Sequence, residues 1–148
     1  MADSKRQQII AALDARLKTI KTAGGYQTNA GLHVFDWLDR DLADAELDAI
    51  VYRDRSNGRE VISTRGLTRN TMFVEIEVKT KNAAGTASQV RKLLEDVLKA
   101  IGTDETFNGL VKTARPGTDN LDIQQAEKIK GSGDFTLSIE YETGKWAF

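Results

Sequence analysis

The stretch TMFVEIEVKT, residues 71–80, alternates apolar side chains with polar or charged ones at a period of two. The apolar side chains on one face are those of Met72, Val74, Ile76 and Val78, while Phe73 falls on the polar face. The stretch FTLSIEY, residues 135–141, repeats the pattern near the end of the sequence. A period of two is typical of a β-strand with one buried face. The sequence therefore predicts a sheet with one apolar and one polar face.

Two other segments have the spacing of amphipathic helices. The first has apolar residues on one face at Ile9, Ile10, Leu13, Leu17 and Ile20, and the second at Val90, Leu93, Leu94, Val97, Leu98 and Ile101. We expect a capping box at the start of each helix, formed by Ser4 with Gln7 and by Thr86 with Gln89. Glycines supply the expected helix ends, at Gly24-Gly25 for the first helix and Gly102 for the second.

Turn signals divide the rest of the sequence into short strands. Asn57-Gly58 favours a type I′ turn, which predicts a hairpin with arms over 49–55 and 59–64. The other expected elements are a short strand around 32–35, weaker strands over 110–114 and 121–126, and a turn at KGSGD, residues 130–134. This order favours a single α+β domain over residues 1–148, in which a mostly antiparallel sheet carries two main helices packed on one face.

The composition excludes several classes of site. The 148 residues include no Cys, which excludes disulfides and thiolate metal sites. No apolar run approaches the ~20 residues of a membrane-spanning helix. The formal net charge of −1 gives no bulk attraction to nucleic acid or to an anionic membrane. These features predict a cytoplasmic protein that folds without redox chemistry or a metal.

Candidate catalytic groups are few. His33 is the only histidine and has no motif around it, so we interpret it as a structural or surface residue. Segment 36–48 carries six carboxylates but lacks the spacing of a calcium-binding EF-hand loop, which favours a solvated connection. We therefore expect no enzyme activity, cofactor or metal. The alternative, a metal-dependent hydrolase or nuclease, would require several of four carboxylates to converge: Asp36, Asp39, Asp41 and Glu46.

Basic residues predict a surface for protein contacts. Arginines gather in and after the expected hairpin: Arg53, Arg55, Arg59, Arg65 and Arg69. Asp54 and Glu60 dilute this charge, and Tyr52 and Phe73 fit a strand face as well as they fit a base-stacking platform. Protein contact is therefore favoured, and a nucleic-acid-binding module is kept as an alternative.

Three aromatic residues stand outside the predicted strand and helix faces. Trp146 and Phe148 follow the last strand, where they either contact another subunit or close the edge of the domain's own core. For Trp37, which precedes most of the acidic segment, a place in the core is the favoured interpretation.

The order of segments along nearly the whole sequence resembles the phage tail terminator family, the small minor tail proteins of tailed phages and prophages. The segments that carry the resemblance are RQQIIAALDARLKTI (6–20), GGYQT (24–28), VFDW (34–37), LADAELDAIVYRD (42–54), FVEIEVKT (73–80), VRKLLEDVLKAIGTDETFNGL (90–110) and LSIEYETGKW (137–146). A neighbouring neck or tail-completion protein of the same virions is the alternative within this resemblance.

The resemblance implies a non-enzymatic structural protein of the virion, assembled in the host cytoplasm, with an α+β fold and no membrane partner. It implies a homo-oligomer, a hexameric ring on the head-proximal end of the tail tube. Such a ring contacts the tail tube protein, ends tube polymerisation and presents a joint to the head–tail connector protein. DNA passes through the ring without sequence-specific binding.

A ring built from identical subunits needs two different, matching patches on each subunit. The expected hairpin, residues 53–60, and the acidic segment, residues 36–48, carry opposite charge and form our hypothesis for these patches. The candidate interface residues are Trp37, Asp39, Asp41, Arg53, Arg55, Arg59, Trp146 and Phe148.

Overall fold

The structure is a computed structural model that describes residues 3–38, 40–63, 65–81, 85–125 and 129–148. Its elements along the chain are α1 (Lys5–Leu17), η1 (Thr22–Gly24), η2 (Ala30–Leu32), β1 (Val34–Asp36), η3 (Asp44–Glu46), β2 (Ala49–Val61), β3 (Leu67–Lys81), α2 (Thr86–Gly102), β4 (Thr113–Pro116), β5 (Asn120–Gln125) and β6 (Ile129–Gly144), where η marks a 3₁₀ helix. The weak strands expected at 110–114 and 121–126 are therefore β4 and β5, with shifted ends.

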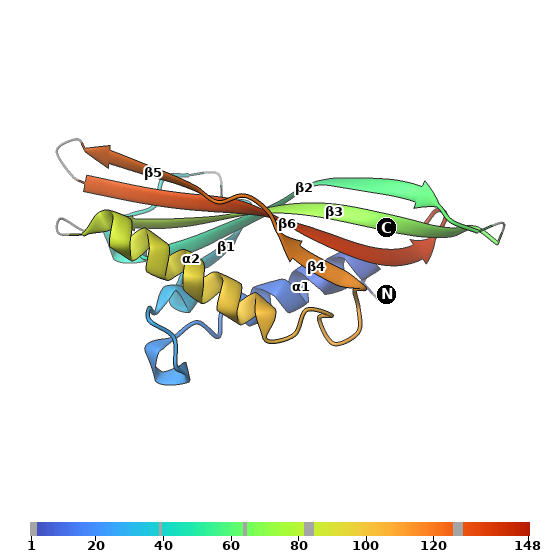
Figure 1. The fold of residues 1–148 in the computed structure, drawn as a ribbon, viewed down its shortest axis with the longest axis horizontal. Coiled ribbons are helices and arrows are strands. Elements are labelled where there is room, and N and C mark those ends of the chain that lie inside the picture. Colours follow the sequence, from blue (N-terminus) through green and yellow to red (C-terminus); the bar gives the residue numbers. More distant parts are fainter. Residues whose placement is uncertain (1–2, 39, 64, 82–84, 126–128) are drawn as a thin grey trace.

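Six strands form one twisted sheet, and α1 and α2 pack together on one of its faces (Figure 1). The strand order is β1-β2-β3-β6-β4, and β5 also pairs with β6. All pairs are antiparallel except β1 with β2. The structure confirms the expected α+β class, the mostly antiparallel sheet and the two helices on one face. We call the opposite face of the sheet the open face.

The two stretches with period-two alternation are the central strands. β3 pairs with β6 along its whole length, from Leu67 opposite Gly144 to Lys81 opposite Lys130. The alternate side chains that point to the helices are buried: Met72, Val74, Ile76 and Val78 from β3, and Phe135, Leu137, Ile139 and Tyr141 from β6. They form one core with the predicted apolar faces of α1 and α2. The alternation therefore predicted both the strands and their buried face.

The expected turn at Asn57-Gly58 is wrong. Asn57 lies opposite Met72 inside the β2–β3 ladder, and the chain turns instead between Ile62 and Leu67. The side chain of Asn57 is held within the strand, because it accepts a hydrogen bond from the Tyr141 hydroxyl at 3.1 Å and donates one to Asn70 Oδ1 at 3.0 Å. These tertiary partners override the local preference for a turn.

The expected turn at residues 130–134 is also wrong, because β6 runs straight through it. Gly131 and Gly133 lie on the helix side of β6, under α2. A Cβ at Gly131 would lie 2.5 Å from Thr86 Cγ2, and one at Gly133 would lie 2.7 Å from Val90 Cγ1. These glycines therefore provide space for a close helix rather than a change of chain direction.

The helix ends agree with the sequence only in part. Ser4 caps α1, because its Oγ accepts a hydrogen bond from Gln7 N at 3.1 Å. However, α1 ends at Leu17, and Gly25, at φ 91°, ends the short helix η1 instead. The N-cap of α2 is Gly85, at φ 92°, without a side-chain cap hydrogen bond, so the second expected capping box is wrong.

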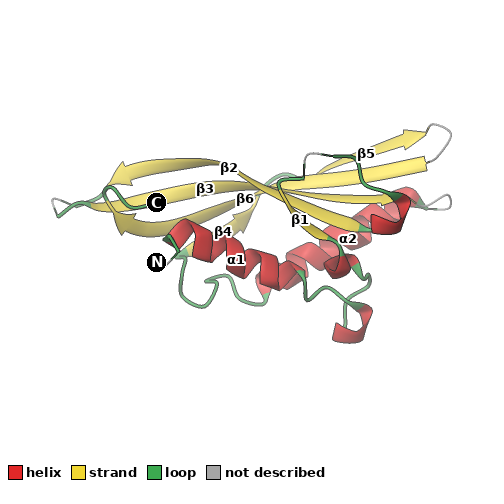
Figure 2. Cartoon of the chain, turned by 180° about the vertical axis from the view of Figure 1, so that it is seen from behind, coloured by secondary structure: helices red, strands yellow, loops and turns green. Residues whose placement is uncertain are grey.

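One end of the sheet projects past the helices. There the far parts of β2, β3 and β6 continue beyond α1 (Figure 1). We call this region, residues 57–71 and 140–148, the distal end. Both termini of the chain lie near it (Figure 2).

Replacing Gly133 with Ala should destabilise the protein by about 1–3 kcal/mol, because the new methyl group would force α2 away from β6. The clash involves Val90 Cγ1 at 2.7 Å and Leu94 Cδ1 at 3.0 Å. Urea unfolding measures the loss. Gly144→Ala is the matched control within the same strand, since a Cβ there meets no atom within 4 Å, and it should change stability by less than about 0.5 kcal/mol. Equal losses for the two variants would contradict this account.

Candidate interaction surfaces

The chain folds back on itself after β6. Ala147 N donates a hydrogen bond to Gly144 O at 3.1 Å, and Arg6 N at the start of α1 donates one to Phe148 O at 3.5 Å. The Phe148 ring lies against two guanidinium groups, with its centroid 4.7 Å from Arg6 Cζ and 6.0 Å from Arg59 Cζ. Such cation–π contacts hold the ring in place although the residue is half exposed.

Exposed apolar side chains occur at this end of the sheet. Trp146 is 91% exposed, and Val61 and Leu67, on either side of the β2–β3 turn, are exposed as well. Three cationic residues lie beside them, and none of the three forms an ion pair among the described residues. We call this set the distal patch: Arg59, Val61, Arg65, Leu67, Lys145, Trp146 and Phe148. It combines exposed aromatic rings with available positive charge, which is the composition that protein interfaces favour.

Polar side chains fill the interior beneath the distal patch. Asn70 is fully buried and donates a hydrogen bond to Thr143 Oγ1 at 2.8 Å. Asn57 and Tyr141 continue the hydrogen-bonded chain, and burial raises the pKa of the Tyr141 phenol. The distal end is therefore held by a polar network rather than by an extension of the apolar core.

Ion pairs across neighbouring strands cover the open face. Arg53, whose side chain is 15% exposed, contacts Glu75 at 3.4 Å and Glu77 at 3.5 Å. Arg55 pairs with Glu75 at 2.7 Å. Further along the sheet, Arg69 pairs with Glu140 at 2.9 Å, and Lys112 pairs with Glu142. The charges of Arg53 and Arg55 are thus compensated within the chain, which gives little support to a nucleic-acid surface built on them.

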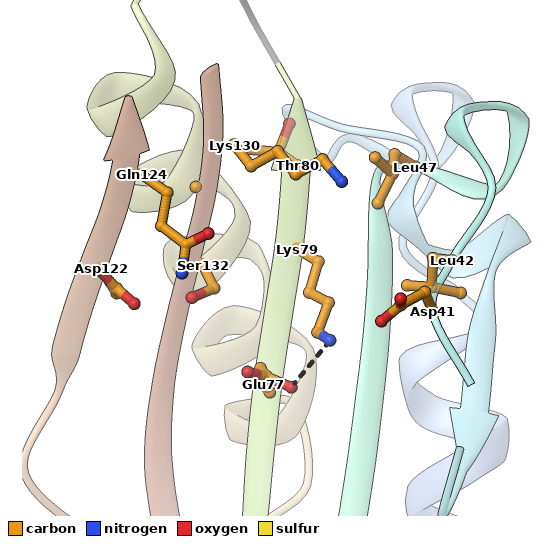
Figure 3. A pocket seen from close by; sticks show the side chains of 11 residues that line it. Asp41, Leu42, Leu47, Glu77, Lys79, Thr80, Asp122, Gln124, Lys130 and Ser132 are labelled. Atoms are coloured by element: carbon orange, nitrogen blue, oxygen red, sulfur yellow. Dashed lines mark ion pairs between the residues drawn. The ribbon is translucent and has the colours of Figure 1, made fainter. Parts of the chain in front are cut away.

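The acidic segment crosses the open face and forms one wall of a groove, as Figure 3 shows in close-up. Asp41, Leu42 and Leu47 make this wall. The opposite wall is β5, with Asp122 and Gln124, and the remaining lining comes from β3 and β6: Glu77, Lys79, Thr80, Lys130, Gly131 and Ser132. We call this space, with a volume of about 370 Å³, the open-face groove.

Charge in the open-face groove is only partly compensated. Lys79 Nζ lies 3.6 Å from Glu77 Oε1, so the two charges in the floor neutralise each other. Asp41 and Asp122, on opposite walls, have no ion pair among the residues that the structure describes. Lys130 adds one positive charge at the rim. The groove thus presents one available carboxylate on each wall, and the wall that carries Asp41 also has apolar side chains.

Short hydrogen bonds fix the shape of the acidic segment. Both carboxylate oxygens of Glu46 accept hydrogen bonds from the Arg40 guanidinium at 2.7 Å, and Ala43 N donates to Glu46 Oε1 at 3.0 Å. These bonds lower the pKa of Glu46 to about 2, the Arg40 hydrogen bond being the largest cause. At the end of the segment, Asp48 accepts hydrogen bonds from Thr80 and Gln89.

The carboxylates that the structure describes in this segment do not form a metal centre. Glu46 is occupied by Arg40, and no group of three or more His, Cys, Asp or Glu within the described residues could hold a metal ion. His33, half-buried, has its Nδ1 3.3 Å from the Asp48 carbonyl oxygen. The alternative based on a metal-dependent nuclease or hydrolase therefore gains no support from these residues.

The core interpretation of Trp37 is wrong. The residue has a φ of 53°, is 44% exposed and lies at the outer edge of β2. Its Nε1 donates a hydrogen bond to Asp54 Oδ1 at 2.8 Å, and the Arg55 guanidinium lies 5.7 Å from its ring. Asp54 also pairs with Arg6 at 2.8 Å. Trp37 thus belongs to a polar cluster rather than to the apolar core.

A second part of this cluster is strongly acidic. The Tyr52 hydroxyl donates a hydrogen bond to Asp14 Oδ1 at 2.9 Å, and Asp36 lies opposite Tyr52 in the β1–β2 register. Burial is the largest cause that raises the pKa of Asp36, followed by repulsion from Asp54 and Asp14. Burial is also the main cause of the raised pKa of Tyr52.

The structure separates the candidate interface residues into several places. Arg59, Trp146 and Phe148 meet in the distal patch, whereas Asp41 lies at the groove. Trp37 and Arg55 lie together at the edge of β2, and Arg53 lies in the ion-pair network of the open face. Asp39 lies outside the described residues. Their roles at an interface stay predictions.

Val61, Leu67 and Lys145 were missed by the sequence interpretation. The sequence predicted the turn at Asn57-Gly58, whereas in the structure the chain turns between Val61 and Leu67. The positions of these two residues beside the turn were therefore not expected. The available signal was the pair of apolar residues that flank Ser63 and Gly66 at similar distances from the turn.

Comparisons with known proteins give no relative. No protein-family model matches the chain, and no curated protein matches it. In the described part of the chain, no helix is long and apolar enough to cross a membrane.

Replacing Phe148 with Ala should cost about 0.5–1 kcal/mol of stability, because two cation–π contacts are lost. Trp146→Ala is the matched control, and its loss should stay below about 0.5 kcal/mol, since that side chain lies in solvent. Urea unfolding, at a protein concentration where sedimentation finds only monomers, measures both. A larger loss for Trp146→Ala than for Phe148→Ala would contradict this account, because the exposed ring would then contribute more to stability than the ring held by the two arginines.

Replacing Asp36 with Asn should stabilise the protein at pH 7. The pKa of Asp36 is raised on folding, so its protonated form favours the folded state; this contribution is full below the ordinary pKa and lost as pH rises through the folded value. The gain should be roughly 0.3 kcal/mol, because solvent screens an exposed carboxylate. Thermal unfolding should show the difference at pH 7 and none near pH 3. Asp119→Asn, in an exposed loop, is the control; a gain for Asp36→Asn that persists at pH 3 would contradict this explanation.

Proposed function

We propose that this protein is a non-enzymatic structural protein of a phage tail. In this proposal six copies form a ring that caps the head-proximal end of the tail tube. The ring ends tube polymerisation and joins the tail to the head connector, and DNA passes through it without sequence-specific binding. The starting point is the order of segments, which resembles that of tail terminators along nearly the whole sequence.

The observation that carries the proposal is the pair of unlike surfaces on one subunit. The distal patch offers exposed aromatic rings and three cations, while the open-face groove offers two carboxylates, and none of these five charges has an ion-pair partner within the described part of the chain. A closed ring of identical subunits requires two such different surfaces on each copy. An elongated subunit with one surface at each end suits that requirement.

The nucleic-acid-binding alternative has weaker support. It relied on five arginines, of which Arg53 and Arg55 are paired with glutamates of β3 and Arg69 is paired with Glu140. Of the five, only Arg59 and Arg65 have no ion pair among the described residues. Of the two candidate stacking platforms, Tyr52 is buried, and Phe73 lies on the same open face as this compensated network. A surface of alternating charges gives little net attraction to a phosphate backbone.

The mass of the assembled protein, alone and with the tail tube protein encoded in the same genome, tests the proposal. Native mass spectrometry should find a six-subunit species. Electron microscopy should show rings at one end of the tubes, and addition of the protein should stop tube growth. A ring that binds a connector but leaves tube growth unchanged would favour the neck-protein alternative. A strict monomer that leaves tubes unchanged would overturn the proposal.

A further inference from the structure

We propose that the distal patch of one copy of this chain docks into the open-face groove of a second copy. The contact is head-to-tail, and it rests on the proposed function because it supplies the subunit interface that a ring needs. It replaces the earlier hypothesis for the interface, in which Arg53 and Arg55 provided the positive surface. Those two side chains form ion pairs with Glu75 and Glu77 of their own chain.

The distal patch presents an aromatic ring and cationic side chains to solvent. Trp146 is 91% exposed and stands next to Lys145, whose Nζ lies 5.3 Å from the indole centroid. Arg65 is exposed in the β2–β3 turn, and the position of Gly66 in that turn approaches Lys145. Positive charge and an aromatic ring are therefore presented together at the distal end.

The tail is well placed to present this surface. Phe148 is held by Arg6 and Arg59, so the short turn before it is fixed at both ends, by β6 and by the start of α1. Trp146 lies within that turn and points into solvent. An exposed side chain on a backbone that is already held in place costs little backbone freedom when it binds a partner.

The open-face groove has the complementary chemistry. Its available carboxylates, Asp41 and Asp122, face each other across the groove, and Figure 3 shows them on opposite sides of the β3 floor. Leu42 and Leu47 provide an apolar wall for an aromatic ring. The volume of about 370 Å³ falls within the usual range for binding pockets, about 300–1,000 Å³.

The positions of the two surfaces determine the kind of assembly. β3 runs from the distal patch at Leu67 to the groove at Lys79. A strand of that length spans about 40 Å at roughly 3.3 Å per residue. A subunit therefore cannot fill its own groove, and each docked copy leaves one patch and one groove available. Such a contact closes into a ring when the rotation between neighbours permits it.

Charge-swapped variants test the pairing of these two surfaces. The patch variant carries Arg65→Glu with Lys145→Glu, and the groove variant carries Asp41→Lys with Asp122→Lys. All four side chains are exposed, so circular dichroism and thermal unfolding should show an intact fold for both. Each variant alone faces like charge at every contact. Each should need on the order of 100-fold more protein for half assembly than the unaltered chain, as measured by sedimentation.

An equimolar mixture of the two variants gives the sharper result. The altered patch of one then faces the altered groove of the other, and the two unaltered surfaces also meet. Assembly should return, and native mass spectrometry should find equal numbers of the two variants in each assembled particle. The rescue should weaken as salt rises, because solvent ions screen exposed charge pairs.

A control variant separates this pairing from a general effect of charge. Arg91→Glu with Lys92→Glu makes the same change in net charge as the patch variant, on the exposed side of α2, and should assemble normally. If the unaltered chain assembles and the patch and groove variants do so equally well, the inference is overturned while the ring proposal stands. Failure of the mixture to assemble would likewise overturn the pairing. A strictly monomeric unaltered chain, alone and with tubes, would overturn both proposals.

Discussion

The antiparallel pairing of β3 with β6 is the constraint on which the other features depend. Because side chains alternate between faces, the register of this one pair sends the buried apolar residues of both strands toward the helices and the charged ones toward the open face, which also carries Leu67 and Phe73 of β3. The core, the ion-pair network and the groove floor all follow from it. The same pairing continues past the helices, which creates the projecting distal end.

Much of the fold could be predicted because it depends on local patterns. The alternation in β3 and β6 and the helical spacing in α2 require no knowledge of distant partners. The failures came where a distant contact decides the conformation. Asn57 remains in a strand because Tyr141 and Asn70 bind its side chain, and Gly133 remains in a strand because α2 passes over it. Both residues carry the same turn signal that a real turn would carry.

The candidate surfaces were less predictable than the fold. The aromatic residues after β6 were recognisable from their position, since no strand or helix face accounts for them. The pairing of Arg53 with Glu75 was not, because it depends on which residues of β2 and β3 lie opposite each other. The irregular register between Asp54 and Ser56 adds a further shift that the sequence does not reveal. Charge on a strand therefore indicates a surface without saying whether that charge is available.

The polar interior of the distal end determines how far the sheet extends. An alternating apolar strand tolerates a slip of two residues, because the same faces remain buried. Asn57, Asn70 and Thr143 do not tolerate it, because the hydrogen bonds that join their side chains across the strands would be lost and buried polar groups would be left unpaired. The network thus fixes the register of the long hairpin. It fixes how far the exposed turn stands from the helices, and so sets the reach of the subunit toward whatever it contacts.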